Sequence, residues 1–311
     1  MGGSMKLTRR GFLKTASLAA ATTAFVPSVA LGRGKERTLL ILHTNDLHCH
    51  FEAQPENHPV NAGKGGLHRI SAYVKALRKT CPDLLLFDSG DFSQGTPYFN
   101  FFGAEVILKL MSEMGYSAST VGNHEFDNGL QQLSLALHHA RFPLINSNYD
   151  FSETPLSGKI DRHRVFEQNG LRVGVYGLGV ELDGLVDPAK SGATRYLDPL
   201  ETAWEEEAYL RREEKCDLIV CLSHLGYSYS EPDRISDVLL ASRTHFTDVI
   251  LGGHTHTFLK QPQQFRNKRK KEVVVNQAGW AALQMGRLEF VFEQRQTFFL
   301  MPHPNHDFTR S

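Results

Sequence analysis

Short apolar runs alternate along the chain with segments of helical periodicity. The apolar runs, bounded by polar or glycine-rich loops, predict strands at residues 39–42, 84–87, 119–121, 143–145, 172–178, 218–222, 249–251, 273–276 and 287–292. Apolar residues at helical spacing predict helices at residues 67–77, 106–114, 130–140 and 199–215, the last with Asp198 as its N-cap. This alternation favours an α/β layered sheet with helices on both faces.

Polar clusters stand directly after five of the expected strands. In α/β sheets, ligands bind in the loops beyond the carboxyl ends of the strands, so we expect these clusters to form one shared site. The clusters are Asp46-x-His48, Gly90-Asp91, Gly122-Asn123-His124-Glu125, His224 and Gly253-His254-x-His256.

The side chains of these clusters predict a metal centre. They offer carboxylates, imidazoles and one amide, a mixed set that suits manganese, iron, zinc or cobalt better than an all-oxygen or all-thiolate set would. Two such ions about 3.5–4 Å apart activate water and stabilise the oxygens of a phosphoryl group. The adjoining glycines (Gly90, Gly122, Gly252 and Gly253) let the backbone turn sharply beside the ions.

The order of these clusters resembles that of the calcineurin-like metallophosphoesterase superfamily, and the longer strings are similar to those of its 5′-nucleotidase family. The resemblance extends over roughly residues 38–292, and its strings are highly specific in combination. They are HTNDLHCH (43–50), GDFSQGTPYFN (90–100), GNHEFD (122–127), LSHLG (222–226), GGHTH (252–256) and VNQAG (275–279).

The resemblance implies a fold, a reaction and a division of roles. The fold would be a single-domain, four-layer α/β/β/α sandwich, and the reaction would be hydrolysis of phosphate monoesters, above all 5′-nucleotides, by a metal-bound hydroxide. The first metal would be held by Asp46, His48, Asp91 and His256, and the second by Asp91, Asn123, His224 and His254, with Asp91 as the bridge.

The resemblance also implies catalytic residues that bind no metal. His124 would contact the phosphoryl oxygens, and Asp127 would orient its ring, in keeping with the need of a catalytic imidazole for a fixed partner. Asn123 would help to position the phosphate. Glu125 belongs to the same string, and we assign no chemistry to it.

The chain departs from the family pattern after its last expected strand. Family members continue into a second domain that holds the nucleotide, whereas this sequence stops at Ser311. The chain could pair with a separate nucleotide-binding subunit, act alone on another phosphoester, or be cut within residues 293–311. Other chemistries of the same core are phosphodiester, nucleotide-sugar and thiosulfate-ester hydrolysis. A metal-binding subunit with little activity is less favoured, because the ligand set and the His124–Asp127 pair are intact.

The first 37 residues are interpreted as segments outside the fold. Residues 1–4 resemble a cloning remnant, Arg9-Arg10 followed by Gly-Phe-Leu-Lys resembles a twin-arginine export signal, and the small residues up to Ala30 suggest cleavage there. We therefore expect an exported, periplasmic protein without a membrane span. The phosphoesterase domain is expected at residues 38–300 and a C-terminal tail at residues 301–311.

Charge and the remaining side chains narrow the function further. Without its first 30 residues the chain has 30 basic and 34 acidic residues, which does not support nucleic-acid binding. The basic run 268–271 is expected at a solvated hairpin tip.

No disulfide can be assigned among Cys49, Cys81, Cys216 and Cys221, and Cys49 is expected to be a bystander thiol rather than a ligand. Ser223 lacks the string of a hydrolase nucleophile. The aromatic residues between 92 and 102 are expected mainly to pack, although exposed members could stack on a base or dock a partner domain.

Overall fold

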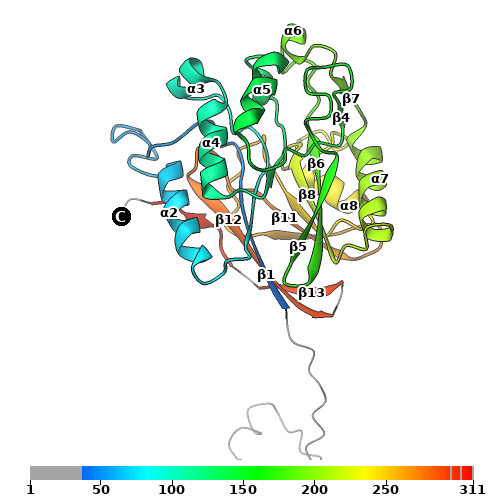
Figure 1. The fold of residues 1–311 in the computed structure, drawn as a ribbon. Helices are drawn as coiled ribbons and strands as arrows, with labels where there is room; N and C mark the ends of the chain where they lie inside the picture. The colour runs from blue at the N-terminus through cyan, green and yellow to red at the C-terminus, as the bar shows by residue number, and fades with distance from the viewer. Residues whose placement is uncertain (1–36, 295, 302, 310–311) are drawn as a thin grey trace, which may run out of the picture. The chain divides into compact units, whose positions relative to one another are not determined.

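A computed structural model describes residues 37–309 except 295 and 302. The residues of the expected cloning remnant, export signal and most of the linker lie outside this described part. Figure 1 shows the arrangement of the elements. No described helix has the length and apolar content that a bilayer crossing requires.

Two six-stranded sheets form the centre of the fold. The first has the order β13-β12-β1-β2-β3, with β14 paired to β12. Its strands are β1 (Arg37–Thr44), β2 (Leu85–Asp88), β3 (Ala118–Ser119), β12 (Gln284–Gln294), β13 (Thr297–Met301) and β14 (His306–Asp307). The parallel pairs β1–β2 and β2–β3 place the loops after these three strands at one edge.

The second sheet has the order β10-β11-β9-β8-β6-β5. Its central strands β6, β8, β9 and β11 are parallel to one another, so their carboxyl ends also meet at one edge. The strands are β5 (His163–Gln168), β6 (Leu171–Gly179), β8 (Leu218–His224), β9 (Val249–Leu251), β10 (Gln263–Arg266) and β11 (Glu272–Asn276). A small antiparallel pair is formed by β4 (Tyr149–Asp150) and β7 (Arg195–Tyr196).

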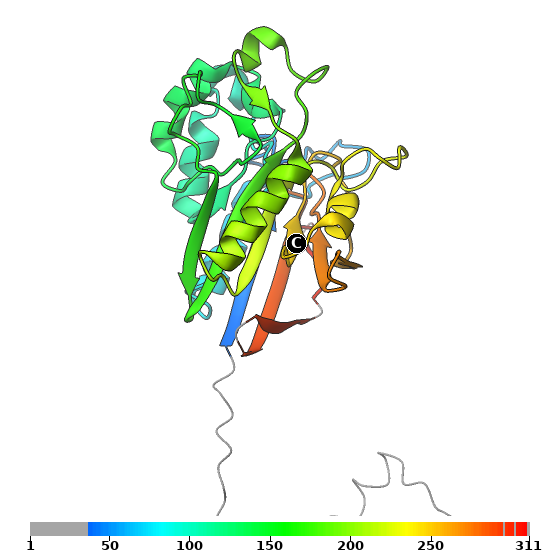
Figure 2. The ribbon, with the colours of Figure 1, turned by 90° about the vertical axis from the view of Figure 1, so that its right-hand side faces the viewer.

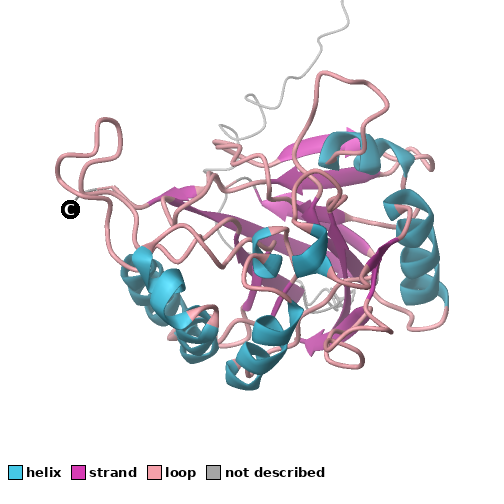
Figure 3. Cartoon of the chain, turned by 90° about the horizontal axis from the view of Figure 1, so that it is seen from above, coloured by secondary structure: helices cyan, strands magenta, loops and turns pink. Residues whose placement is uncertain are grey.

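Helices cover the outer faces of both sheets (Figure 3). Those packed on the first sheet are α2 (Leu67–Arg78), α4 (Glu105–Met114) and α5 (Leu130–Ala136), and those on the second are α7 (Pro199–Arg212) and α8 (Asp237–Arg243). Figure 2 shows α7 across the second sheet. The short helical segments are α3 (Pro97–Phe102), η1 (His124–Phe126), η2 (Leu137–His139) and α6 (Pro188–Ser191).

The alternation of side chains along β1 explains the order of the layers. Leu39 and Ile41 face the core between the two sheets, whereas Leu40 and Leu42 face the core beneath the helices. Successive side chains of a strand point to opposite faces, so a strand that is buried on both faces must be apolar throughout. The α/β/β/α sandwich and the single domain expected from the sequence are confirmed.

Two of the expected strands differ from the structure. Residues 119–121 contribute only Ser119 to β3, and residues 143–145 form isolated bridges rather than a strand, with Leu144 opposite Ser119 and Ile145 opposite Asp161. The sequence-based expectations also omitted β5, β10 and α8. The expected helix at 130–140 ends as α5 at Ala136 and continues as the 3₁₀ turn η2.

Candidate metal centre

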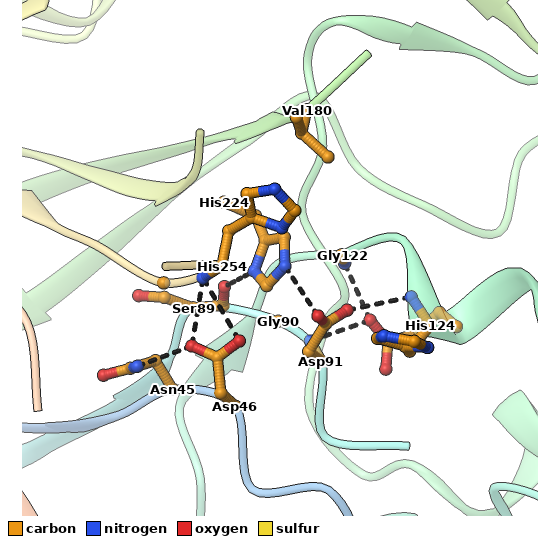
Figure 4. Close-up of polar contacts among 12 residues, drawn as sticks. Asn45, Asp46, Ser89, Gly90, Asp91, Gly122, His124, Val180, His224 and His254 are labelled. Atoms are coloured by element: carbon orange, nitrogen blue, oxygen red, sulfur yellow. Dashed lines mark hydrogen bonds and ion pairs between the residues drawn. The ribbon is translucent and has the colours of Figure 1, made fainter. Parts of the chain in front are cut away.

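The predicted ligands meet at the carboxyl ends of both sheets. In the first sheet, Asp46 and His48 follow β1, Asp91 follows β2 and Asn123 follows β3. In the second sheet, His224 ends β8, and His254 and His256 follow β9. Six of these side chains form two groups whose ligand atoms lie within 4.8 Å of one another: Asp46, His48 and His256, and Asp91, His224 and His254. Figure 4 shows Asp91 between His224 and His124.

In the first group, nitrogen atoms of two imidazole rings lie close together. Nε2 of His48 lies 3.1 Å from Nε2 of His256, and the carboxylate oxygen Oδ1 of Asp46 lies 3.3 Å from His256 Nε2 and 3.9 Å from His48 Nε2. Two imidazole nitrogens and a carboxylate oxygen that converge in this way suit one divalent cation.

The second group centres on Asp91. Its Oδ2 lies 2.9 Å from Nε2 of His224, and its Oδ1 accepts the backbone N–H of His124 at 2.9 Å. The ring of His254 lies 5.3 Å from that of His224. By distance Asp91 belongs to this group, and its role as the bridge to the first group stays a prediction.

Backbone carbonyls hold two of the rings in the orientation that metal binding needs. Nδ1–H of His224 donates to the carbonyl of Ser89 at 2.6 Å, and Nδ1–H of His48 donates to that of Ser93 at 3.2 Å. A carbonyl only accepts, so these bonds place a proton on Nδ1 of each ring and direct its Nε2 atom into the site.

A buried atom beside the second group supports the fit of a cation. Oδ1 of Asn123 is buried and has no hydrogen-bond partner among the described residues. A buried polar atom without a partner is costly, and a bound ion is one way in which a native structure satisfies it. The donor set therefore fits a divalent cation at this position.

Electrostatics couples the buried residues of the second group. Burial disfavours the charged imidazole of His224, but the carboxylate of Asp91 outweighs burial and raises the pKa of His224 to about 10. Burial would raise the pKa of Asp91, yet His224, His48 and His124 together hold it below its usual range. Burial lowers the pKa of His254 to about 4, which favours the neutral ring that a metal requires.

The backbone at the ligands is strained. Five of the seven predicted ligands have left-handed φ angles: Asp46 (50°), His48 (47°), Asp91 (54°), His254 (72°) and His256 (52°). Such conformations cost about 1–3 kcal/mol for a residue with a side chain, and they concentrate at functional sites. Hydrogen bonds between the loops hold them, such as Asp46 N–H to the carbonyl of Gly90 at 2.9 Å.

Gly122 shows why the glycine beside the ligands is required. A Cβ built on Gly122 would lie 2.3 Å from Oδ1 of Asp91 and 2.7 Å from Nε2 of His224. These atoms belong to buried side chains that cannot move aside easily, so only glycine fits here.

His124 stands beside the ligands without belonging to either group. Its Nδ1 is paired with Oδ2 of Asp127 at 2.8 Å, and this hydrogen bond raises the pKa of His124 to about 9. Its ring lies 5.2 Å from that of His48, and about a third of its side chain is exposed. The predicted pair is therefore formed, and its imidazole lies next to the metal ligands.

Sequence reasoning missed the role of Glu125. Its buried carboxylate accepts three backbone N–H groups, those of Asp91 (2.9 Å), Ser93 (3.0 Å) and Gly122 (2.7 Å). Burial raises the pKa of Glu125 to about 7. Glu125 thus ties together the loops that carry two of the predicted ligands, and only its place in the GNHEFD string pointed to it.

Trp280 is a second residue that the sequence did not single out. Its ring stacks on that of His256, with centroids 5.2 Å apart and planes within 3°. It stands one residue after the VNQAG string, which was the only signal in the sequence. The stacking fixes the ring of His256, the most exposed side chain of the first group.

The other candidates have structural roles. Cys49 is buried, burial raises the pKa of its thiol to about 12, and its sulfur lies 3.6 Å from the carbonyl of Phe92, as expected for a bystander. All four cysteines are unpaired. The hydroxyl of Ser223 donates to the carboxylate of Asp237 at 2.5 Å and is buried.

The aromatic residues after Asp91 divide between packing and exposure. Phe92 and Phe99 are buried, as expected for packing, whereas Phe101 and Phe102 on α3 are 80% and 53% exposed. The basic run 268–271 lies at the exposed tip of the hairpin β10–β11, as expected.

Comparison with known proteins identifies the family. The family model described as calcineurin-like phosphoesterase matches residues 39–258. The chain belongs to the calcineurin-like phosphoesterase family. A 5′-nucleotidase of Vibrio cholerae serotype O1 is 34% identical over 255 residues, which are 77% of this chain and 44% of that protein. A bovine 5′-nucleotidase is 32% identical over 231 residues, which are 71% of this chain and 38% of that protein. This phosphoesterase thus spans less than half of the length of these relatives.

Solved structures agree with this family. The 5′-nucleotidase precursor from Thermus thermophilus has a TM-score of 0.79 and 31% identity, over 88% of this chain and 55% of that one. The calcineurin-like phosphoesterase YfkN from Bacillus subtilis has a TM-score of 0.69 and 21% identity, over 88% of this chain and 91% of that one, and shares the fold. The fold is that of metal-dependent phosphoesterases, a family that uses divalent metals.

Proposed function

We propose that the chain hydrolyses phosphate monoesters, with 5′-nucleotides as the preferred class. The observation that carries the proposal is the pair of three-residue ligand groups with His124 and Asp127 beside them. The relatives named 5′-nucleotidases support the choice of substrate.

Each set of residues would have a distinct part in the reaction. Asp46, His48, Asp91 and His256 would hold one divalent ion (manganese, zinc, iron or cobalt), and Asp91, Asn123, His224 and His254 would hold a second. Two such ions supply Lewis acidity and activated water when they are bound. His124 would donate a hydrogen bond to the phosphoryl or leaving-group oxygen, and its pairing with Asp127 keeps the donor protonated at neutral pH.

A substrate panel tests the proposal. The purified chain, supplied in turn with Mn²⁺, Zn²⁺, Co²⁺ and Mg²⁺, would be assayed on AMP, a 2′,3′-cyclic nucleotide, UDP-glucose and mono- and bis-(p-nitrophenyl) phosphate. We expect AMP to give the highest kcat/KM. Preference for a diester or for UDP-glucose would assign the same centre to another bond. Two bound ions without turnover of any compound would favour a binding subunit that needs a separate nucleotide-binding partner.

We also propose that the protein is exported to the periplasm through the twin-arginine route. The support is the Arg9-Arg10 string and the cleavage pattern near Ala30. Fractionation of cells that express the chain tests this proposal, because replacing both arginines by lysine should retain the protein in the cytoplasm. Equal export of the two forms would contradict it.

A further inference from the structure

A cavity of about 440 Å³ lies far from the candidate metal centre. Its walls come from residues 204–212 of α7, the loop before β9 and the tip of the hairpin β10–β11. These segments stand at the amino ends of the parallel strands, whereas the metal ligands stand at the carboxyl ends. The seven residues of β8 separate the two ends by roughly 20 Å at the usual rise of a strand.

Two arginines of this cavity meet at one aromatic ring. The guanidinium carbon of Arg212 lies 5.4 Å from the centroid of Phe246, and that of Arg269 lies 4.5 Å from it. Within the described part of the chain, neither arginine is paired with a carboxylate. Each guanidinium carries a positive charge at the cavity wall, so an anion bound there would be stabilised.

The indole ring of Trp204 forms an aromatic wall of the cavity and is held in a fixed orientation. The indole N–H of Trp204 donates to the carbonyl of Arg243 at 2.9 Å, and its ring meets that of His245 edge to face at 5.9 Å. The side chain of Trp204 is still 38% exposed. A flat ligand can therefore stack on an indole whose orientation is set beforehand.

The loop that carries Phe246 is held by a buried carboxylate. Glu207 accepts the backbone N–H groups of His245 (2.7 Å), Phe246 (2.9 Å) and Thr247 (2.8 Å), and also the hydroxyl of Thr247. These donors engage both oxygens of Glu207, which is fully buried. These bonds hold the loop in place. The carboxylate of Glu207, which lines the cavity, is surrounded by N–H and O–H groups and by Nδ1 of His245 at 3.4 Å.

We infer that this cavity binds an anion joined to a flat aromatic ring, of which nucleoside phosphates are the type. The guanidinium groups of Arg212 and Arg269 match phosphate oxygens, and Trp204 offers a stacking surface for a base. The volume lies within the range of small-molecule sites. The inference goes beyond the proposed hydrolysis, because the cavity holds no group of metal ligands among its described residues and binds without reaction.

The two tryptophans of the chain allow a direct test. Trp280 stands at the metal centre, so the variant Trp280→Phe leaves Trp204 as the only tryptophan. The metal-loaded variant would be titrated with the phosphonate analogue of AMP, in which a methylene replaces the ester oxygen and blocks hydrolysis. We expect saturable quenching of Trp204 fluorescence, and at least tenfold weaker binding after Arg212→Gln or Arg269→Gln in the same background.

Matched controls separate this site from general attraction of anions. Arg266→Gln removes an equal charge from exposed β10 outside the cavity and should leave the affinity unchanged. Inorganic phosphate and adenosine should each compete at least tenfold more weakly than the analogue. The inference is overturned if Trp204 shows no saturable quenching at millimolar ligand, if Arg266→Gln weakens binding as much as the cavity variants, or if phosphate alone competes equally.

Discussion

Single residues of the candidate centre differ in how firmly they are held. His224 is fully buried between the carbonyl of Ser89 and the carboxylate of Asp91, so its ring cannot turn. His124 is partly exposed, and Asp127 is the partner of its ring. A ligand must be immobile, whereas a group that donates to a substrate must reach solvent-accessible space. The burial of the two histidines therefore matches their proposed roles.

The variant His124→Ala tests this division at the scale of one residue. We expect kcat to fall by about 10²–10⁴-fold, the range for loss of a positioned proton donor, while both metals stay bound. Steady-state kinetics and elemental analysis of the purified protein provide the two measurements. His138→Ala, which changes an exposed histidine on η2, should have neither effect. Loss of metal in His124→Ala would show that His124 supports the ligands instead.

The candidate ligands could be predicted because metal binding depends on the residue type. Asp91 and His224 have side chains that bind metals, and both stand where a strand ends. Glu125 acts through the backbone N–H groups of Ser93 and Gly122, a group that every residue type except proline carries. Such a role depends on how loops approach one another in space, and no residue type in the sequence marks it.

At the scale of elements, local signals predicted the helices better than the edge strands. Asp198 caps α7 as expected, since its carboxylate accepts the N–H groups of Leu200 and Glu201 at 2.8 Å. The edge strand β5 reads HRVFEQ and is half-exposed, so it lacks the apolar run of a buried strand. Its pairing with β6 is a tertiary contact, which propensity alone does not reveal.

The loops after β2 and β3 behave as one unit through Glu125, and Glu125→Gln tests this. The amide keeps one acceptor oxygen and turns an N–H₂ group toward N–H donors, so at least one buried donor loses its partner. We expect the free energy of unfolding to fall by about 1–3 kcal/mol, with reduced turnover, in denaturant titrations and kinetic assays.

The matched control for this variant is Glu113→Gln. Glu113 lies on α4, is mostly exposed and pairs with Arg141 on the surface, where an ion pair contributes little. Equal stability of the two variants would show that the carboxylate of Glu125 does not hold the loops.

At the scale of the whole molecule, each ligand group draws on both sheets. Asp46 and His48 come from the first sheet and His256 from the second, whereas Asp91 comes from the first and His224 and His254 from the second. A bound ion in either group would connect the two sheets at their carboxyl edge. Metal binding should therefore stabilise the entire sandwich and not only the loops.

Removal of metal tests this coupling. An ion present at 100 times its dissociation constant adds about 2.7 kcal/mol, which corresponds to roughly 5–10 °C in Tm for a domain of this size. We expect EDTA to lower the Tm of the metal-loaded chain by at least this amount in scanning calorimetry. The shift should be much smaller in Asp91→Asn, and an equal shift in both would contradict the assignment of Asp91.

Each ligand group takes residues from both sheets, and this determines when the centre can form during synthesis. About 210 residues separate Asp46 from His256, and a ribosome that adds about 5–20 residues per second needs roughly 10–40 s to make them. When β1 and β2 leave the ribosome, Asp46 and Asp91 have been made, but the histidines that complete each ligand group have not. Neither ligand group would be complete until β9 has joined its sheet, so a nascent chain would acquire metal only when the domain is almost complete.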